Sequence, residues 1–296
     1  MSLGRLPEFE PGGARERLSD VNAASSTAEG AVFEAPAALR GHAQGRTLRT
    51  FTDDAGTAWH YRDNGRRNAL PPLVLLPGAL GNGDTAWQLA EAFEAERRVI
   101  AVTYPGGLAP QALASGLDGL LNALQAGPVA LWGSSYGAWW AQAFAARYPQ
   151  QAAALWLGNT FVDGNDVADV PLFNAEWLDT ATSDEVVARW HAALAARPDD
   201  LLRSVQLYML HHGMPAHAFH ARLRQVAHAQ TLPPAAHIAK TVVCACEDDA
   251  VITSAVRERV RQGYPNARHL LLSRGGHYPH IVTPEALVQA MRVWLS

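Results

Sequence analysis

The chain has 296 residues, 48% of them hydrophobic, and a formal net charge of −4. This length and composition predict a globular protein with a sizeable core, built as one large domain or two smaller ones. The acidic balance argues against general nucleic-acid binding, which needs a basic face to neutralise phosphates. The two cysteines, Cys244 and Cys246, offer no disulfide framework, so a reducing cytoplasm is the expected location.

The first 44 residues are expected to form a mostly disordered tail. They combine Gly, Ala, Pro and Ser with charged residues and contain no apolar run long enough for a signal peptide or a membrane span. Folded structure is predicted to begin near Gly45. A β-hairpin should follow, with strands at residues 46–52 and 57–62 around an Asp-Asp-Ala-Gly turn.

Strand and helix patterns then alternate along the chain. Apolar strands are predicted at residues 73–76, 98–102, 129–132, 154–157, 240–245 and 268–272. Helices are predicted at residues 84–96, with Asp84 as the cap, and at 113–124, 136–148, 254–263 and 284–294. This alternation predicts an α/β fold with a doubly wound, mostly parallel sheet that helices cover on both faces.

One long segment breaks the alternation. From about residue 163 to residue 237 there is no convincing strand, only helical patterns around 183–196, 200–210 and 216–229. An insertion of this size most simply forms a helical cap over the carboxyl edge of the sheet, where open α/β sheets bind ligands. The predicted organisation is a tail of residues 1–44 and one domain of residues 45–296, with the cap at about 163–237.

Residues 128–139 join an apolar strand, a turn of small residues and a helix pattern. Residues 133–137 read Gly-Ser-Ser-Tyr-Gly, which fits the pattern G-x-S-x-G. Packing a strand directly into a helix through one residue strains that residue, and the flanking glycines let the two elements approach. Ser135 should therefore stand exposed beside helix amides that suit a developing negative charge. An ordinary Gly/Ser turn is the alternative, against which the strand-and-helix setting argues.

Four motifs, in this order, resemble those of the α/β-hydrolase family. They are Leu76-Pro77-Gly78-Ala79-Leu80-Gly81, the turn around Ser135, Cys246-Glu247-Asp248-Asp249 and Gly275-Gly276-His277. The resemblance covers roughly residues 45–296 and implies a serine hydrolase of α/β-hydrolase fold that needs no cofactor. It makes Ser135 the nucleophile and His277 the base that activates it. The alternative for His277 is a structural loop histidine.

The acid of the implied triad has two candidates in the same turn. Asp248 and Asp249 both follow the predicted strand, but neighbours in a turn point in different directions and only one can reach the imidazole. The family pattern, with Cys246 where Gly is usual, implies Asp249 and leaves Asp248 as a solvated turn residue. Some relatives place the acid after the preceding strand, which here means Asp163 or its vicinity.

The resemblance also implies an oxyanion hole made of backbone amides. The donors are Tyr136, which follows the nucleophile, and Ala79, from the Gly-rich loop after the first long strand. The common family motif has His before Gly, whereas this chain has Pro77 before Gly78. Because the donor belongs to the main chain, this departure bears on the shape of the loop more than on its role.

A second likeness is to maspardin-type proteins. It rests on Arg98-Val99-Ile100-Ala101, Tyr104-Pro105, Asn159-Thr160-Phe161-Val162-Asp163 and Tyr264-Pro265-Asn266-Ala267-Arg268. Some relatives of this type lack the catalytic histidine, which makes a non-catalytic binding protein the alternative to an enzyme; His277 is present here.

The predicted function is hydrolysis of a small to medium carboxylic ester through an acyl-enzyme. A thioesterase, perhydrolase or carbon–carbon bond hydrolase with the same triad is a further alternative.

Histidines and positively charged residues gather in the predicted cap and just after it. They are His211, His212, His217, His220, His228 and His237, with Arg203, Arg222, Arg224 and Lys240. His217 and His220 have a helical ligand spacing, but zinc sites recruit three or four defined ligands with supporting hydrogen bonds, so no metal is expected. A weakly basic cap that becomes cationic below the usual histidine pKa, and favours anionic substrates, is the prediction.

Overall fold

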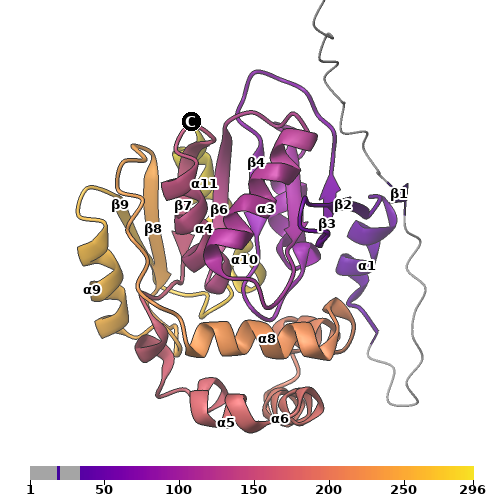
Figure 1. The fold of residues 1–296 in the computed structure, drawn as a ribbon, viewed down its shortest axis with the longest axis vertical. Coiled ribbons are helices and arrows are strands. Elements are labelled where there is room, and N and C mark those ends of the chain that lie inside the picture. Colours follow the sequence, from indigo (N-terminus) through magenta and orange to yellow (C-terminus); the bar gives the residue numbers. More distant parts are fainter. Residues whose placement is uncertain (1–18, 21–33) are drawn as a thin grey trace, which may run out of the picture.

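A single sheet runs through the described part of the chain, which in this computed structural model comprises residues 19–20 and 34–296 (Figure 1). Its strands are β1 Ser19–Asp20, β2 Arg49–Thr52, β3 Ala58–Asp63, β4 Leu73–Leu76, β5 Val99–Thr103, β6 Val129–Ser134, β7 Ala152–Gly158, β8 Thr241–Cys246 and β9 Arg268–Leu272. They lie in the order β1-β2-β3-β5-β4-β6-β7-β8-β9. The pairs β1–β2, β2–β3 and β3–β5 are antiparallel, and the remaining pairs are parallel. The predicted mostly parallel sheet is confirmed.

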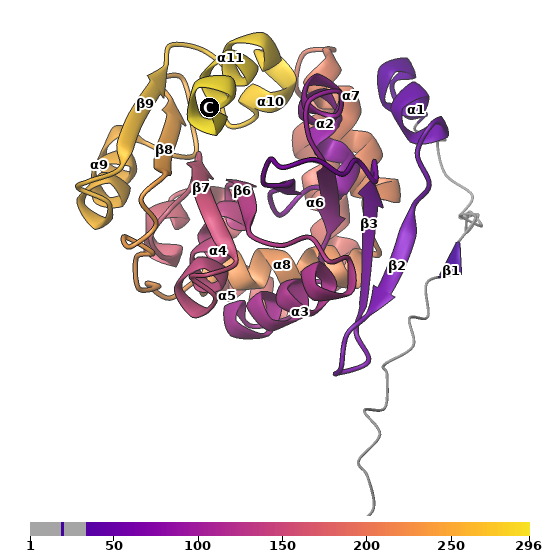
Figure 2. The same ribbon diagram turned by 90° about the horizontal axis from the view of Figure 1, so that it is seen from above.

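Helices cover both faces of the sheet because side chains alternate along each buried strand. Leu131 and Leu155 pack on one face, which carries α3 (Pro110–Ala123), α4 (Tyr136–Arg147) and α9 (Ser254–Gly263). Trp132 and Trp156 pack on the other face, beneath α2 (Trp87–Phe93) and α11 (Pro284–Leu295). Figure 2 shows α3 and α4 on the opposite side of the sheet from α11 and α2. No helix in the described residues is both long and apolar enough to cross a membrane.

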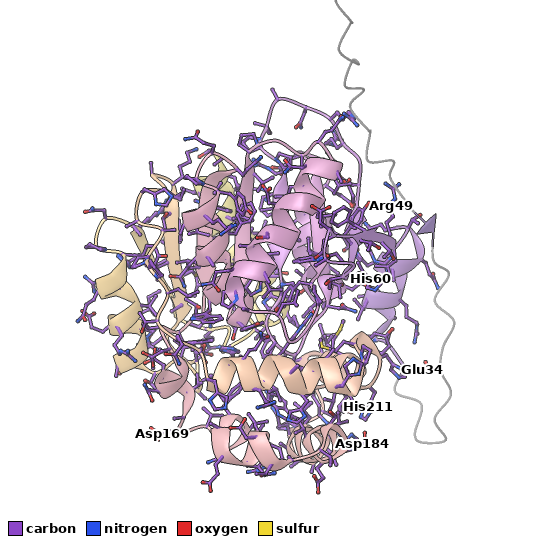
Figure 3. The ribbon with its side chains drawn as sticks, viewed as in Figure 1. Glu34, Arg49, His60, Asp169, Asp184 and His211 are labelled. Carbon is purple, nitrogen blue, oxygen red and sulfur yellow. The ribbon has the colours of Figure 1, made fainter. Side chains whose placement is uncertain are left out.

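The chain between β7 and β8 is helical and lies at the carboxyl ends of the parallel strands (Figure 1). Its elements, here called the inserted helices, are η2 Gly164–Val167, η3 Pro171–Phe173, α5 Ala175–Thr180, α6 Ser183–Ala195, α7 Leu201–Tyr208, η4 Met209–Gly213 and α8 Ala216–Ala227. Helix α8 lies next to the strands, and α5 and α6 lie beyond it; Figure 3 shows Asp184 and His211 in this layer. Leu178, Trp190 and Phe219 belong to the same apolar core as α3 and α4. The inserted helices are therefore packed onto the sheet domain.

Helix α1, Ala37–Gln44, lies within the segment expected to be a disordered tail. Leu39 is buried against Trp87 and Ile281, and the Nδ1 atom of buried His42 lies 3.1 Å from Glu91 Oε1. The expectation that structure begins near Gly45 is wrong for this helix, because eight residues are too few for a helical pattern to stand out in the sequence. The rest of the expected tail is largely residues 1–18 and 21–33, which are outside the described residues.

The helix predicted from Asp84 also starts differently. Asn82, not Asp84, provides the cap: its side chain accepts a hydrogen bond from the Asp84 amide at the start of the 3₁₀ turn η1, Gly83–Ala86. The Asp84 carboxylate instead pairs with the guanidinium of Arg62, with Nε and Oδ1 2.6 Å apart. A charge-assisted pair of this kind outcompetes a neutral amide donor.

Candidate active site

Ser135 stands in the turn between β6 and α4 in a strained conformation. Its backbone has φ 52° and ψ −121°, in the region that non-glycine residues rarely adopt. The turn is tight: a Cβ atom added to Gly137 would lie 2.3 Å from the Leu76 carbonyl oxygen. The Ser135 amide donates to Gly158 O at 2.8 Å, and Thr160 Oγ1 donates to Ser135 O at 3.1 Å. These bonds fix the serine at the carboxyl end of its strand.

His277 bridges Ser135 and Asp249 through its two ring nitrogens. Nε2 lies 2.9 Å from Ser135 Oγ, and Nδ1 lies 2.8 Å from Asp249 Oδ2. The histidine is reached through Gly275, whose φ of 138° few other residues tolerate, and a Cβ there would lie 2.8 Å from Pro279 Cβ. A hydroxyl, an imidazole and a carboxylate that are far apart in the sequence thus form one hydrogen-bonded chain, which can draw the hydroxyl proton onto the imidazole.

The Asp249 carboxylate is buried and fully hydrogen-bonded. Oδ1 accepts from the amides of Val251 and Ile252 at 2.8 and 3.0 Å, while Oδ2 accepts from Asn159 Nδ2 at 2.7 Å besides its bond to His277. Burial alone would raise its pKa, but the charge and hydrogen bond of His277 and the two amides lower the pKa of Asp249 to about 2. The carboxylate is therefore ionised at neutral pH and able to stabilise a positive imidazolium.

Asn159 is a site residue that the sequence analysis did not single out. It directly follows β7 with φ 45°, and its Nδ2 donates both to Asp249 and, at 2.8 Å, to the Gly276 carbonyl. One amide group therefore ties the carboxylate to the loop that carries His277. Its sequence signal is a polar residue directly after a buried strand, at the sheet edge where ligand-binding side chains gather.

The two other candidate acids have different partners. Asp248 is exposed in its turn, as expected, and its carboxylate also accepts from the amides of Gly275 and Gly276 at 3.2 and 2.8 Å and so shapes the His277 loop. Asp163 caps η2 and pairs with Arg259 at 2.8 Å, and this hydrogen bond lowers the Asp163 pKa. Of the three aspartates, Asp249 is the one that the structure places on the imidazole.

The expected oxyanion donors flank the serine. Tyr136 is the first residue of α4, directly after Ser135. The loop that holds Ala79 also lies against the serine, because a Cβ atom added to Gly78 would be 3.4 Å from Ser135 Cβ. Both Ala79 and Tyr136 are buried. Two backbone segments thus meet beside the hydroxyl, as a site for a developing oxyanion requires.

Two histidines of α8 and its C-terminal end are held by local partners. His228 Nε2 lies 3.0 Å from the Asp179 carboxylate, and His220 Nε2 lies 2.7 Å from the Leu178 carbonyl oxygen. In the described residues, no three His, Cys, Asp or Glu side chains are arranged to hold a metal ion. Burial, together with His191 and His212, lowers the pKa of His211, which opposes the expected cationic character at that position (Figure 3).

Two sizeable cavities of the described chain lie outside the arrangement of Ser135, His277 and Asp249. One of about 470 Å³ is bounded by Thr160, by β8 and β9 and by α9. The other, of about 440 Å³, lies between Trp139 and α8. Neither is lined by Ser135 or His277, so neither is assigned as the place where a reacting group binds.

Comparison with known proteins agrees with this geometry. The sequence profile of the alpha/beta hydrolase family matches residues 73–290. The chain belongs to this family. Maspardin from Mus musculus is 27% identical over 237 residues, which cover 77% of this chain and 76% of maspardin.

Solved structures of the family share the fold. An esterase from Thermogutta terrifontis has a TM-score of 0.65 at 22% identity, covering 84% of this chain and 97% of the esterase. The enol-lactonase from Burkholderia xenovorans LB400 has a TM-score of 0.69 at 19% identity, covering 83% of this chain and 99% of the lactonase. At these identities the likeness shows a common architecture, and the chemistry has to be argued from the site.

The lowered pKa of Asp249 predicts a specific acid sensitivity. A carboxylate whose pKa falls from 3.8 to about 2 on folding stabilises the protein above its unfolded pKa and loses that contribution as the pH falls through 2. The full effect is about 2 kcal/mol, of which roughly half should be lost between pH 5 and pH 3. Urea unfolding of the wild type and of Asp249→Asn at both pH values measures it. Equal losses in the two proteins would contradict the assignment.

Proposed function

We propose that the protein is a serine hydrolase that cleaves carboxylic esters through an acyl-enzyme, without a cofactor. The observation that carries the proposal is the continuous chain from Ser135 Oγ through His277 to Asp249, with contacts of 2.9 and 2.8 Å. Its elements are those that turn a weakly nucleophilic hydroxyl into an attacking group. Esters are the simplest substrates for such a site, because their alkoxide leaving group needs only one proton.

Each residue has one task in this reaction. Ser135 Oγ attacks the ester carbonyl carbon while its proton passes to His277 Nε2, and the carbonyl oxygen becomes an oxyanion held by the amides of Ala79 and Tyr136. When the intermediate collapses, the imidazolium gives its proton to the departing alkoxide and the acyl group stays on Ser135. Water then attacks the acyl-enzyme with His277 as base, releasing the acid. Asp249 remains ionised throughout and orients the ring.

The inserted helices supply the cap in this proposal. They follow β7 and lie at the sheet edge that carries Ser135, whereas the three reacting side chains all come from outside them. Cap contacts distant from the reacting carbon select the acyl or alcohol part of the substrate.

We place this activity in the cytoplasm, since Cys244 and Cys246 are both free and buried. Recovery of the protein in a periplasmic or secreted fraction would contradict that location.

The alternative is a binding protein on the same scaffold, which the likeness to maspardin favours. A fluorophosphonate discriminates the two, because it reacts only with an activated serine. We expect labelling of wild-type Ser135, located by mass spectrometry of the modified peptide. Ser135→Ala should abolish labelling and lower ester hydrolysis on the order of 10⁶-fold. Ser134→Ala, at the buried end of β6, is the matched control and should retain both; an unlabelled wild type would favour the binding protein.

Asp249 and Asp248 should differ in their effect on turnover. Loss of the carboxylate on the imidazole misplaces the proton or the ring, so Asp249→Asn is expected to lower kcat about 10⁴-fold. Asp248→Asn retains an oxygen that can still accept from the Gly275–Gly276 amides, and should cost no more than roughly 10-fold. Steady-state kinetics of both variants in one assay decides between them. Comparable losses would mean that the loop, not the carboxylate on the ring, limits catalysis.

Substitution of Phe173, a half-buried residue of the inserted helices, tests whether the cap selects the substrate. It packs edge-on against Trp190, with ring centroids 5.9 Å apart. Phe173→Ala should change the relative kcat/KM of esters of increasing acyl length by about 1 to 3 kcal/mol per methylene. Labelling of Ser135 by a small phosphonate should persist at the wild-type rate. An unchanged chain-length profile would show that this part of the cap does not contact substrate.

A further inference from the structure

Arg222 is a buried charge without an acidic partner. It lies on α8 with 1% of its surface exposed, and among the described residues no carboxylate pairs with it. Its guanidinium bonds to backbone oxygens instead. Nη1 donates to Gly81 O at 2.7 Å and to Ala79 O at 3.4 Å, and Nη2 donates to Tyr104 O. Burying an arginine in this way costs more than burying an apolar side chain of the same size, so stability alone does not explain it.

Two of the three carbonyls that Arg222 holds belong to the loop of the expected oxyanion donor. Ala79 O and Gly81 O follow β4 on the same loop that lies against Ser135. The guanidinium carbon is also 4.0 Å from the centre of the Tyr104 ring, a cation–π contact that fixes the two side chains together. A residue of the inserted helices therefore forms part of the support of the catalytic loop.

Tyr104 holds the preceding carbonyls of that loop. Its hydroxyl donates to Pro77 O at 2.6 Å and to Gly78 O at 3.3 Å. Burial raises the pKa of Tyr104 to about 12, although Arg222 opposes the shift, so the hydroxyl keeps its proton. The described chain contains no cis peptide, and in a trans peptide the C=O and N–H groups point in opposite directions. Holding Gly78 O toward Tyr104 therefore turns the Ala79 N–H away from Tyr104.

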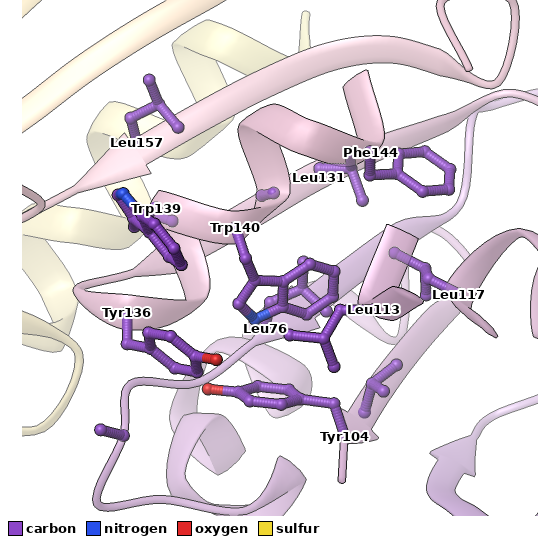
Figure 4. Packing of buried hydrophobic residues seen from close by; sticks show 14 of the residues in the cluster. Leu76, Tyr104, Leu113, Leu117, Leu131, Tyr136, Trp139, Trp140, Phe144 and Leu157 are labelled. Atoms are coloured by element: carbon purple, nitrogen blue, oxygen red, sulfur yellow. The ribbon is translucent and has the colours of Figure 1, made fainter. Parts of the chain in front are cut away.

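The same helix also holds the second donor residue. Tyr136 Oη donates to Gln225 Oε1 at 2.6 Å, and Gln225, one turn after Arg222 on α8, donates to Leu108 O. The Tyr104 and Tyr136 rings lie side by side, with centroids 5.9 Å apart and their hydroxyls turned toward the same space (Figure 4). Helix α8 is thus bonded to the loop of one oxyanion donor and to the side chain of the other.

We propose that Arg222, with Tyr104, positions the oxyanion hole by holding the 77–81 loop so that the Ala79 amide faces Ser135. The proposal rests on the serine hydrolase function proposed above. The Tyr104 hydrogen bond to Gly78 O also polarises the peptide between Gly78 and Ala79, which makes the Ala79 N–H a better donor. Arg222 is a positioning residue here: it acts on the transition state through the loop and does not touch the substrate.

The test compares Arg222→Met with Arg98→Met. Arg98 is also buried, but it pairs with Asp63 at 2.6 Å and bonds to Leu124 O, away from the 77–81 loop. Its loss destabilises the protein without touching that loop. A trifluoromethyl ketone reports on the hole: Ser135 Oγ adds to its carbonyl carbon, the Ser135 proton moves to His277, and the carbonyl oxygen becomes the oxyanion. All measurements are made well below the melting temperature of each variant.

Arg222→Met should lower kcat and ketone affinity together by about 10²-fold, with KM changed less than threefold. Arg98→Met should leave both within about twofold of the wild type, whatever its melting temperature. Hydrogen–deuterium exchange of residues 77–83 should accelerate in Arg222→Met and not in Arg98→Met. A fall in kcat shared by both variants, or a rise in KM without a fall in kcat, would overturn the proposal.

Tyr104→Phe covers the case in which Arg222→Met does not fold. It removes only the hydroxyl and should lower kcat and ketone affinity in parallel by about 10-fold with KM unchanged; equal constants for this variant and the wild type would overturn the proposal. Failure of the serine hydrolase function is distinguishable, because it appears as a wild type that the fluorophosphonate does not label. In that case hydrogen–deuterium exchange of residues 77–83 still tests whether Arg222 holds the loop. An exchange rate in Arg222→Met equal to that of the wild type would show that it does not.

Discussion

The strained backbone of Ser135 is the constraint to which the site is fitted. Strand β6 lies between β4 and β7, and α4 follows it with no connecting loop, so one residue has to reverse the chain direction. A conformation of this kind costs of the order of 1 to 3 kcal/mol and persists only where packing on both sides overdetermines it. Here that packing comes from α4, whose Trp139 and Trp140 are buried together with Tyr136 (Figure 4). The backbone of Ser135, and with it the direction in which its side chain leaves the chain, is therefore fixed.

The other site residues reach this fixed hydroxyl from the ends of neighbouring strands. Parallel strands end at one edge, so the loops after β4, β7, β8 and β9 converge there. The Asp249 carboxylate binds several of these parts together. It contacts His277, Asn159 and two amides of its own turn, and Asn159 in turn holds the Gly276 carbonyl. A buried charge that is so completely hydrogen-bonded keeps its ionised form and holds the ring that contacts Ser135 in one orientation.

The sequence was sufficient to predict those parts of the site that consist of a few adjacent residues. The strand–turn–helix around Ser135 and the Gly-Gly-His run each occupy a few adjacent residues, and periodicity gave the parallel sheet with boundaries close to those observed. What it missed depends on contacts between distant segments. Asn159 meets Asp249 across 90 residues, and Arg222 meets Gly81 across 141. No local pattern says that an amide or a guanidinium will be turned toward a particular carbonyl.

Asp248 and α1 show two further limits of the same kind. Asp248 stays exposed in its turn, but nothing in its local sequence indicates that it binds the amides of the Gly275–Gly276 loop. The eight residues of α1, with one fully apolar anchor, look disordered until Trp87 covers Leu39. In both cases the decisive free energy comes from a partner that the segment itself does not contain. Local sequence therefore gives the chemical groups of this site more reliably than their supports.

Helix α8 shows why those supports matter for how the fold works. The inserted helices were expected to form a cap over the carboxyl edge of the sheet that contributes neither a triad residue nor an oxyanion donor. Arg222 and Gln225 on α8 are nevertheless bonded to the 77–81 loop and to Tyr136. If α8 moved away, the loop carbonyls would lose their donors and a buried guanidinium would lose its partners, both of which carry a large penalty in a dry interior. The position of α8 and the order of the loop are therefore energetically linked. On the proposed function, this linkage means that the elements selecting the substrate also help to assemble the site that stabilises its oxyanion.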